Sequence, residues 1–196
     1  GYDECMRRRE YLAATVGAVT LTAGCTGHNE MSGEIIDPEP SVTEEGLALN
    51  PVDVDEVEVD PDSFSQYNAE GVLVNQVPLD VAYYWYNTKK ARFADARVLS
   101  QYNELRVEGA IHSPAPEGND EDILNEIDKR ERLVTYCTCP HTLSGLRAGN
   151  LIENGYSGVY ALEPGFGPWT QNGYQVEGNS AYRRIQNGNE DYSNIQ

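Results

Sequence analysis

Two cysteines and a histidine that lie close together are the residues best suited to chemistry in this chain. Cys137 directly follows the apolar run at 133–136, and Cys139 and His141 come shortly after it. If that run is a buried strand and a helix begins soon afterwards, the backbone N–H groups of the loop and the helix dipole both favour negative charge on a sulfur held there. Such a thiolate could attack sulfane sulfur, phosphate or a disulfide.

Three other uses of these residues have to be weighed. Cys137, Cys139 and His141 could join His112 in a metal site, but one residue between two cysteines gives poor geometry for tetrahedral coordination, so we expect no metal. Cys139 could instead resolve an oxidised Cys137 as a disulfide, which suits a thiol redox protein outside the cell. The pair could also be buried without any chemistry.

A phosphatase is the function that the sequence argues against most clearly. Phosphatases with a comparable loop need an arginine six positions after the cysteine to grip phosphate with two hydrogen bonds. Leu143 and Gly145 stand six positions after Cys137 and Cys139.

The segments around the cysteines alternate between strand and helix patterns, which is typical of α/β folds with a parallel sheet. We expect strands at 72–77, 92–95, 133–136 and 159–162, and another short element at 107–112. Helices are expected at 79–86, 121–131, 144–154 and 166–172, the last two ended by Gly155 and Gly173.

Several of these segments, taken in order, resemble the rhodanese homology domain. Asp95-Ala96-Arg97, followed by Tyr102 and by 106–112, resembles the first signature of the family, and 133–137 resembles the strand that carries its catalytic cysteine. The runs 151–156 and 159–166, with Trp169, are similar to the second signature. The resemblance implies an α/β fold, a small parallel sheet flanked by helices on both faces.

The resemblance also implies sulfur transfer without a cofactor. Cys137, with Cys139 as the second candidate, would take sulfur from a small sulfur-containing anion such as thiosulfate, hold it as a persulfide and pass it to a thiol or cyanide-type acceptor. A binding module that uses the same fold without catalysis is the contrasting function. The residues implied around the sulfur are Thr138, Cys139, Pro140, His141, Thr142, Leu143 and Ser144 as the active-site loop, with Asp95 and Arg97 as structural support. Arg147 would either reach the pocket mouth and favour an anionic donor or be a solvent-exposed cation on its helix.

The charge of the chain limits its partners. Acidic residues number 32 and basic residues 14, which gives a net charge of −18 and a pI near 4.4. Such a surface repels phosphate backbones, so nucleic-acid binding is not expected. Only three of the basic residues are lysines. An acidic, lysine-poor surface is typical of halophilic proteins, whose charge repulsion is screened by molar salt, and we expect a haloarchaeal source over an ordinary acidic protein.

The N-terminus resembles an export signal with a lipid anchor. Arg7, Arg8 and Arg9 precede a mildly apolar stretch of about 13 residues, which is too short for a membrane-spanning helix of roughly 20. Paired arginines in this position resemble a twin-arginine signal, and 21–25 resembles a lipobox ending at Cys25. We therefore expect an exported protein held on the outer face of the membrane by a lipid on Cys25.

The expected organisation has four parts. Residues 1–25 form the signal, 26–70 an acidic disordered tether with an optional edge strand at 52–61, 71–178 the rhodanese-like domain and 179–196 a polar disordered tail. Nothing in the sequence identifies a protein partner.

Overall fold

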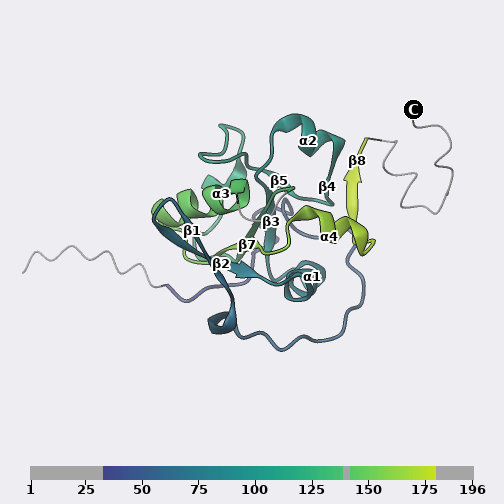
Figure 1. The fold of residues 1–196 in the computed structure, drawn as a ribbon. Helices are drawn as coiled ribbons and strands as arrows, with labels where there is room; N and C mark the ends of the chain where they lie inside the picture. The colour runs from purple at the N-terminus through teal and green to yellow at the C-terminus, as the bar shows by residue number, and fades with distance from the viewer. Residues whose placement is uncertain (1–32, 139–141, 180–196) are drawn as a thin grey trace, which may run out of the picture. The chain divides into compact units, whose positions relative to one another are not determined.

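The computed structural model describes residues 33–138 and 142–179 (Figure 1). The expected signal with Cys25, the loop residues Cys139, Pro140 and His141, and nearly all of the expected tail lie outside the described residues. Among the residues that are described, none of the helices has the length and apolarity needed to span a membrane.

The central element is a six-stranded sheet with strand order β1-β2-β7-β6-β3-β5. Its strands are β1 (Gln66–Ala69), β2 (Val72–Val77), β3 (Arg92–Asp95), β5 (Ile111–His112), β6 (Leu133–Tyr136) and β7 (Val159–Leu162). Only β1 is antiparallel to its neighbour, and the other four pairings are parallel. The two middle strands, β6 and β7, are mainly apolar and buried throughout because both faces of the sheet are covered there.

Helices cover both faces of the sheet, as expected (Figure 1). The helices α1 (Leu79–Asn87) and α4 (Phe166–Gln171) pack on one face, and α3 (Thr142–Glu153) packs on the other. Successive strand residues point to opposite faces, so Val134 joins the core beneath α1 while Leu133 joins the core beneath α3. The chain therefore has the predicted α/β fold with a mostly parallel sheet.

The expected element at 107–112 is two strands in two different sheets. The second sheet pairs β4 (Leu105–Val107), which follows helix α2 (Leu99–Glu104), with the unexpected strand β8 (Val176–Gly178). Gly109 separates β4 from β5 with a φ of 78°, and a β-carbon there would collide with the carbonyl oxygen of Leu47. A side chain at this turn is therefore excluded by both backbone conformation and space.

The helix expected at 121–131 is also absent from the described structure, which has one 3-10 turn there, η2 (Ile123–Glu126). Asp122 caps this turn by accepting a hydrogen bond from the Leu124 N–H at 3.0 Å, and the chain becomes extended at Ile127. Two charged residues of the segment pair with residues outside it: Asp122 with Arg147, and Glu131 with Arg92.

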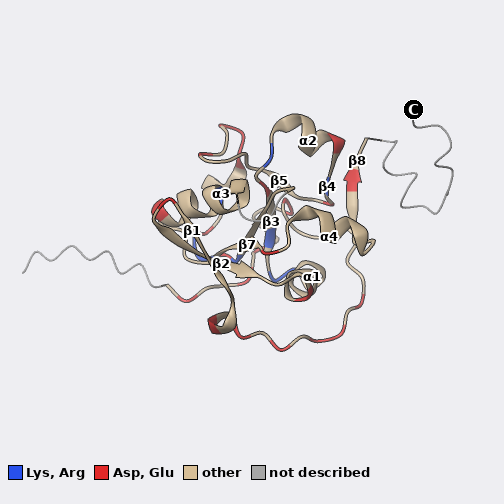
Figure 2. Cartoon of the chain, viewed as in Figure 1, with Lys and Arg blue, Asp and Glu red and all other residues tan. Residues whose placement is uncertain are grey.

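Residues 33–60, which we call the strap, pack on the domain ahead of the 3-10 helix η1 (Pro61–Ser63). Ile36 forms a parallel bridge with Glu131, and Leu47 and Ala48 are 0% and 1% exposed. This differs from the disordered tether that we predicted for 26–70. The strap also forms no strand at 52–61: Val54 and Val57 pack toward the core, while the acidic residues between them are exposed. Figure 2 shows acidic residues, in red, along this stretch of the chain.

Arg92, the first residue of β3, explains why the strap is ordered. Its guanidinium is fully buried and pairs with the Glu131 carboxylate at 2.6 Å. The remaining N–H groups donate to carbonyl oxygens of the strap, those of Glu39 at 3.1 Å, Thr43 at 2.8 Å and Glu45 at 2.6 Å. A buried cation needs all of these acceptors, so the strap is part of the folded domain.

Candidate active site

Cys137 lies at the carboxyl end of β6, in the middle of the sheet. Its side chain is fully buried, and its carbonyl oxygen accepts a hydrogen bond from the Phe166 N–H at 2.8 Å. Phe166 begins α4, directly after Gly165, whose positive φ of 71° turns the chain back toward β6. Because β7 and β3 run parallel to β6, the ends of three strands meet around this cysteine, where ligands of open α/β sheets bind.

The first turn of α3 is next to the sulfur. Ser144 is fully buried, and its Oγ lies 3.4 Å from Cys137 Sγ. The Ser144 carbonyl oxygen accepts a hydrogen bond from Thr135 Oγ1 at 2.9 Å, which fixes the start of the helix on β6. When the sulfur is ionised, the hydroxyl can donate to it, and the amino end of α3 adds a favourable field.

The helix begins earlier than expected, so the predicted active-site loop is shorter. Thr142, Leu143 and Ser144 belong to α3, while Thr138 is exposed beside Cys137. Cys139, Pro140 and His141 lie outside the described residues, and the choice between Cys137 and Cys139 as the nucleophile stays a prediction.

Asp95 and Arg97 form a buried ion pair at the end of the neighbouring strand β3. Asp95 accepts from Arg97 Nε at 2.9 Å and from Nη2 at 2.6 Å, and Nη2 also donates to the Leu105 carbonyl oxygen at 2.6 Å. Burial alone would lower the pKa of Arg97, but the hydrogen bonds and charge of Asp95 outweigh it and raise that pKa. The guanidinium is therefore a permanent, paired cation.

The Arg97 guanidinium also packs against two aromatic rings next to Cys137. It lies 4.5 Å from the ring centre of Phe166 and 5.7 Å from that of Tyr136. The Tyr136 hydroxyl accepts a hydrogen bond from the Val107 N–H at 3.0 Å, and burial raises the pKa of Tyr136 well above its usual value. These contacts fix Tyr136, which precedes the cysteine, and Phe166, whose N–H binds the Cys137 carbonyl oxygen. Because the pKa values of Arg97 and Tyr136 are both raised, neither side chain changes its charge near neutral pH.

Arg147 is not the solvent-exposed cation that was one of its two expected roles. It is 4% exposed, and its Nη2 pairs with Asp122 at 3.0 Å while its Nε donates to Ser113 Oγ at 2.7 Å. Ser113 in turn donates to the Asp122 carboxylate. Arg147 therefore links α3 to the segment after β5. These contacts compensate its buried charge, which would otherwise carry a large desolvation penalty.

Sequence reasoning missed Ser113, Asp122 and Phe166. Asp122 carried a usable signal, since an aspartate ahead of an apolar pair is a helix-capping pattern, but its partner Arg147 is far along the chain. His112 contacts the Arg97 carbonyl oxygen at 3.0 Å and Asn119 at 3.3 Å. Within the described ranges, His, Cys, Asp and Glu side chains form no group of three or more that could hold a metal ion.

Comparison with known proteins gives one family match and several similar structures. Residues 80–172 match the family model of the rhodanese-like domain, and the chain therefore contains such a domain. The BH2092 protein of Bacillus halodurans is similar at 19% identity and a TM-score of 0.47, over 56% of this chain and 88% of that one. The rhodanese-like domain of the Alr3790 protein of Anabaena is similar at 21% identity and a TM-score of 0.49, over 62% of this chain and 91% of that one.

A third similar structure is EanB, solved in a cysteine-persulfide form with ergothioneine. It is 22% identical with a TM-score of 0.46, and the match covers 62% of this chain. The matched part is only 34% of EanB, so most of that protein has no counterpart in the alignment.

Proposed function

We propose that this protein is a rhodanese-like sulfurtransferase or persulfide carrier that holds sulfane sulfur on Cys137. The observation that carries the proposal is the position of Cys137: it lies inside the family match, at the end of β6, with Ser144 Oγ 3.4 Å from its sulfur. A thiolate in that place has a hydroxyl donor and the amino end of a helix to stabilise it.

The proposed reaction has two substitutions at sulfur. The Cys137 thiolate attacks the outer sulfur of thiosulfate, a new S–S bond forms, and the S–S bond of the donor breaks with its electron pair leaving on sulfite. A thiolate or cyanide acceptor then attacks the outer sulfur of the persulfide, and Cys137 leaves as the thiolate.

The test is intact mass of the full chain after incubation with thiosulfate in high salt, followed by cyanide. We expect one added sulfur atom that maps to Cys137 and that cyanide removes. Cys137→Ser should lose the adduct, and the matched variant Cys139→Ser should keep it. An adduct on Cys139 would overturn the assignment of the nucleophile, whereas a disulfide between the two cysteines without any adduct would favour the redox alternative.

We also propose that the protein acts outside the cell, anchored by lipid on Cys25. The support is in the sequence alone, in Arg7 to Arg9 and the lipobox-like run at 21–25. The net charge of −18 with three lysines supports a halophilic, haloarchaeal source and argues against nucleic acid as a partner.

A further inference from the structure

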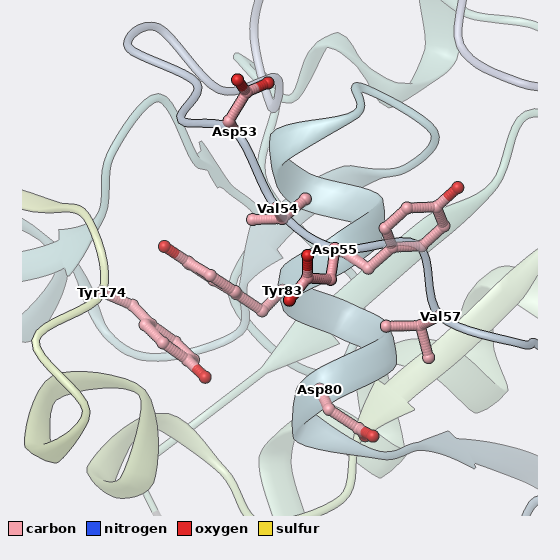
Figure 3. Close-up of a pocket in the computed structure, with 8 residues that line it drawn as sticks. Asp53, Val54, Asp55, Val57, Asp80, Tyr83 and Tyr174 are labelled. Atoms are coloured by element: carbon pink, nitrogen blue, oxygen red, sulfur yellow. The ribbon is translucent and has the colours of Figure 1, made fainter.

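A cavity of about 640 Å³ lies between the strap, helix α1 and the segment that follows α4 (Figure 3). Three tyrosines line it, Tyr83, Tyr84 and Tyr174, together with three aspartates, Asp53, Asp55 and Asp80, and two valines of the strap. None of these residues belongs to the candidate active site. The volume is within the range of roughly 300 to 1,000 Å³ that is usual for small-molecule sites.

The aromatic wall of the cavity is rigid. The rings of Tyr83 and Tyr174 stack with centres 3.6 Å apart and planes 11° from parallel. Both rings also meet Trp169 at steep angles, with centres 5.7 and 5.2 Å away. Trp169 is fully buried, and its Nε1 donates to the Gln175 carbonyl oxygen at 3.0 Å. The wall is thus held by the core and needs no ordering when a ligand binds.

The charged residues that line the cavity all have one sign, although Lys90, which is not among them, donates to the Tyr84 hydroxyl at 3.0 Å and lies 5.0 Å from the centre of that ring. Asp53 and Asp55 come from the strap and Asp80 from the first turn of α1, and in Figure 3 Asp53 lies above and Asp80 below Tyr83. No lysine or arginine lines the cavity, and none of the three carboxylates pairs with a cation among the described residues. Burial raises the pKa of Tyr174, and Tyr83 and Asp80 raise it further, so the phenol stays neutral.

We propose that this cavity binds a small organic cation of the quaternary-ammonium class. The faces of tyrosine rings attract cations, and a quaternary ammonium group keeps an apolar surface that suits the ring faces and valines. The carboxylates supply the opposite charge and exclude anions. Because they are spread along the strap and helix and do not form a metal-binding cluster, an alkylammonium ion fits better than a metal ion.

Choline is a suitable probe, with its neutral isostere, in which carbon replaces the nitrogen, as the matched ligand. Choline is titrated into the full chain at the lowest salt concentration at which circular dichroism shows the protein to be folded, and binding is measured by calorimetry and by tryptophan fluorescence. We expect saturable binding with a Kd of about 1 to 10 mM. Asp53→Asn combined with Asp55→Asn should weaken binding by about 2- to 30-fold, since each exposed charge pair contributes modestly. Asp62→Asn combined with Asp120→Asn makes the same charge change outside the cavity and should leave binding unaltered.

Two further variants separate the ring from its hydroxyl. Tyr174→Phe keeps the aromatic face and should retain choline binding, whereas Tyr174→Leu should lose most of it. The proposal is wrong if choline shows no saturation, if the neutral isostere binds equally well, or if the control pair weakens binding as much as the cavity pair. Equal losses in Tyr174→Phe and Tyr174→Leu would also overturn it, because the ring face would then not be the binding surface.

Discussion

Replacing Arg92 by methionine is predicted to destabilise the domain and release the strap. Methionine has a similar length and is apolar, so it fills much of the space but donates no hydrogen bonds. The Glu131 carboxylate, which is 2% exposed, would lose its partner at 2.6 Å, and the carbonyl oxygens of Glu39, Thr43 and Glu45 would lose their donor.

The magnitude follows from the burial of this pair. Removing one partner of a buried ion pair costs about 3 to 5 kcal/mol, because the other charge stays buried without compensation. That is a large part of the roughly 5 to 15 kcal/mol by which domains are stable. Arg92→Met combined with Glu131→Gln should recover part of the loss, since it removes the orphaned charge.

The assay is urea unfolding of the full chain, with limited proteolysis to report on the strap. Arg130→Met is the matched control: Arg130 pairs with Asp128 at 2.7 Å, but the two side chains are 49% and 41% exposed, so the variant should cost less than about 1 kcal/mol. Molar salt should leave the Arg92 effect in place, because buried pairs are poorly screened. A loss below about 1 kcal/mol in Arg92→Met, with the strap still protected, would refute the reasoning.

Four further predictions concern other parts of the molecule. Ser144→Ala should slow alkylation of Cys137 at neutral pH by about 10-fold, measured with iodoacetamide, because it removes a hydrogen bond to the thiolate; an unchanged rate would contradict this. Gly109→Ala should cost at least about 2 kcal/mol in thermal unfolding through its positive φ and the clash with the Leu47 carbonyl oxygen, whereas Gly71→Ala, with φ of 106° and open space, should cost less. Burial raises the pKa values of Tyr136, Tyr156 and Tyr160, so the stability that these neutral side chains confer is complete below pH ~10 and is lost as the pH rises above it. Tyrosinate absorbance should therefore appear together with loss of the circular dichroism signal. Ionisation of these tyrosines while the protein stays folded would contradict this prediction. Cys25→Ser should move the exported protein from the membrane fraction to the soluble one, and an unchanged distribution would count against lipidation at this residue.

The parts of the fold that could be predicted are those in which one strong local pattern has one explanation. The runs at 133–136 and 159–162 are apolar because these parallel strands are buried on both faces, and they and the run at 72–77 are strands with the expected bounds. The thiol at the end of β6 was found for the same reason, since Cys137 follows such a run directly.

The strap, β1 and the turn at 121–131 could not be predicted because distant partners determine them. The strap is held through its backbone carbonyl oxygens, which every residue has, so its acidic composition conceals the contact with Arg92. The strand β1 is short and polar, and it forms only by pairing with β2. The partners of Arg147 depend on the packing of α3 against the segment after β5, which no periodicity reveals.

The two outer strands of the sheet bear on the tendency of this protein to pair with other chains through its sheet edges. An exposed strand edge is a template for another chain, and many proteins protect it with charge. That protection weakens in molar salt, where the Debye length falls to about 3 Å or less. Here β5 has only two residues and β1 has four, so neither outer strand offers a long template. Short edges limit edge-to-edge aggregation at any ionic strength, because this protection does not depend on charge.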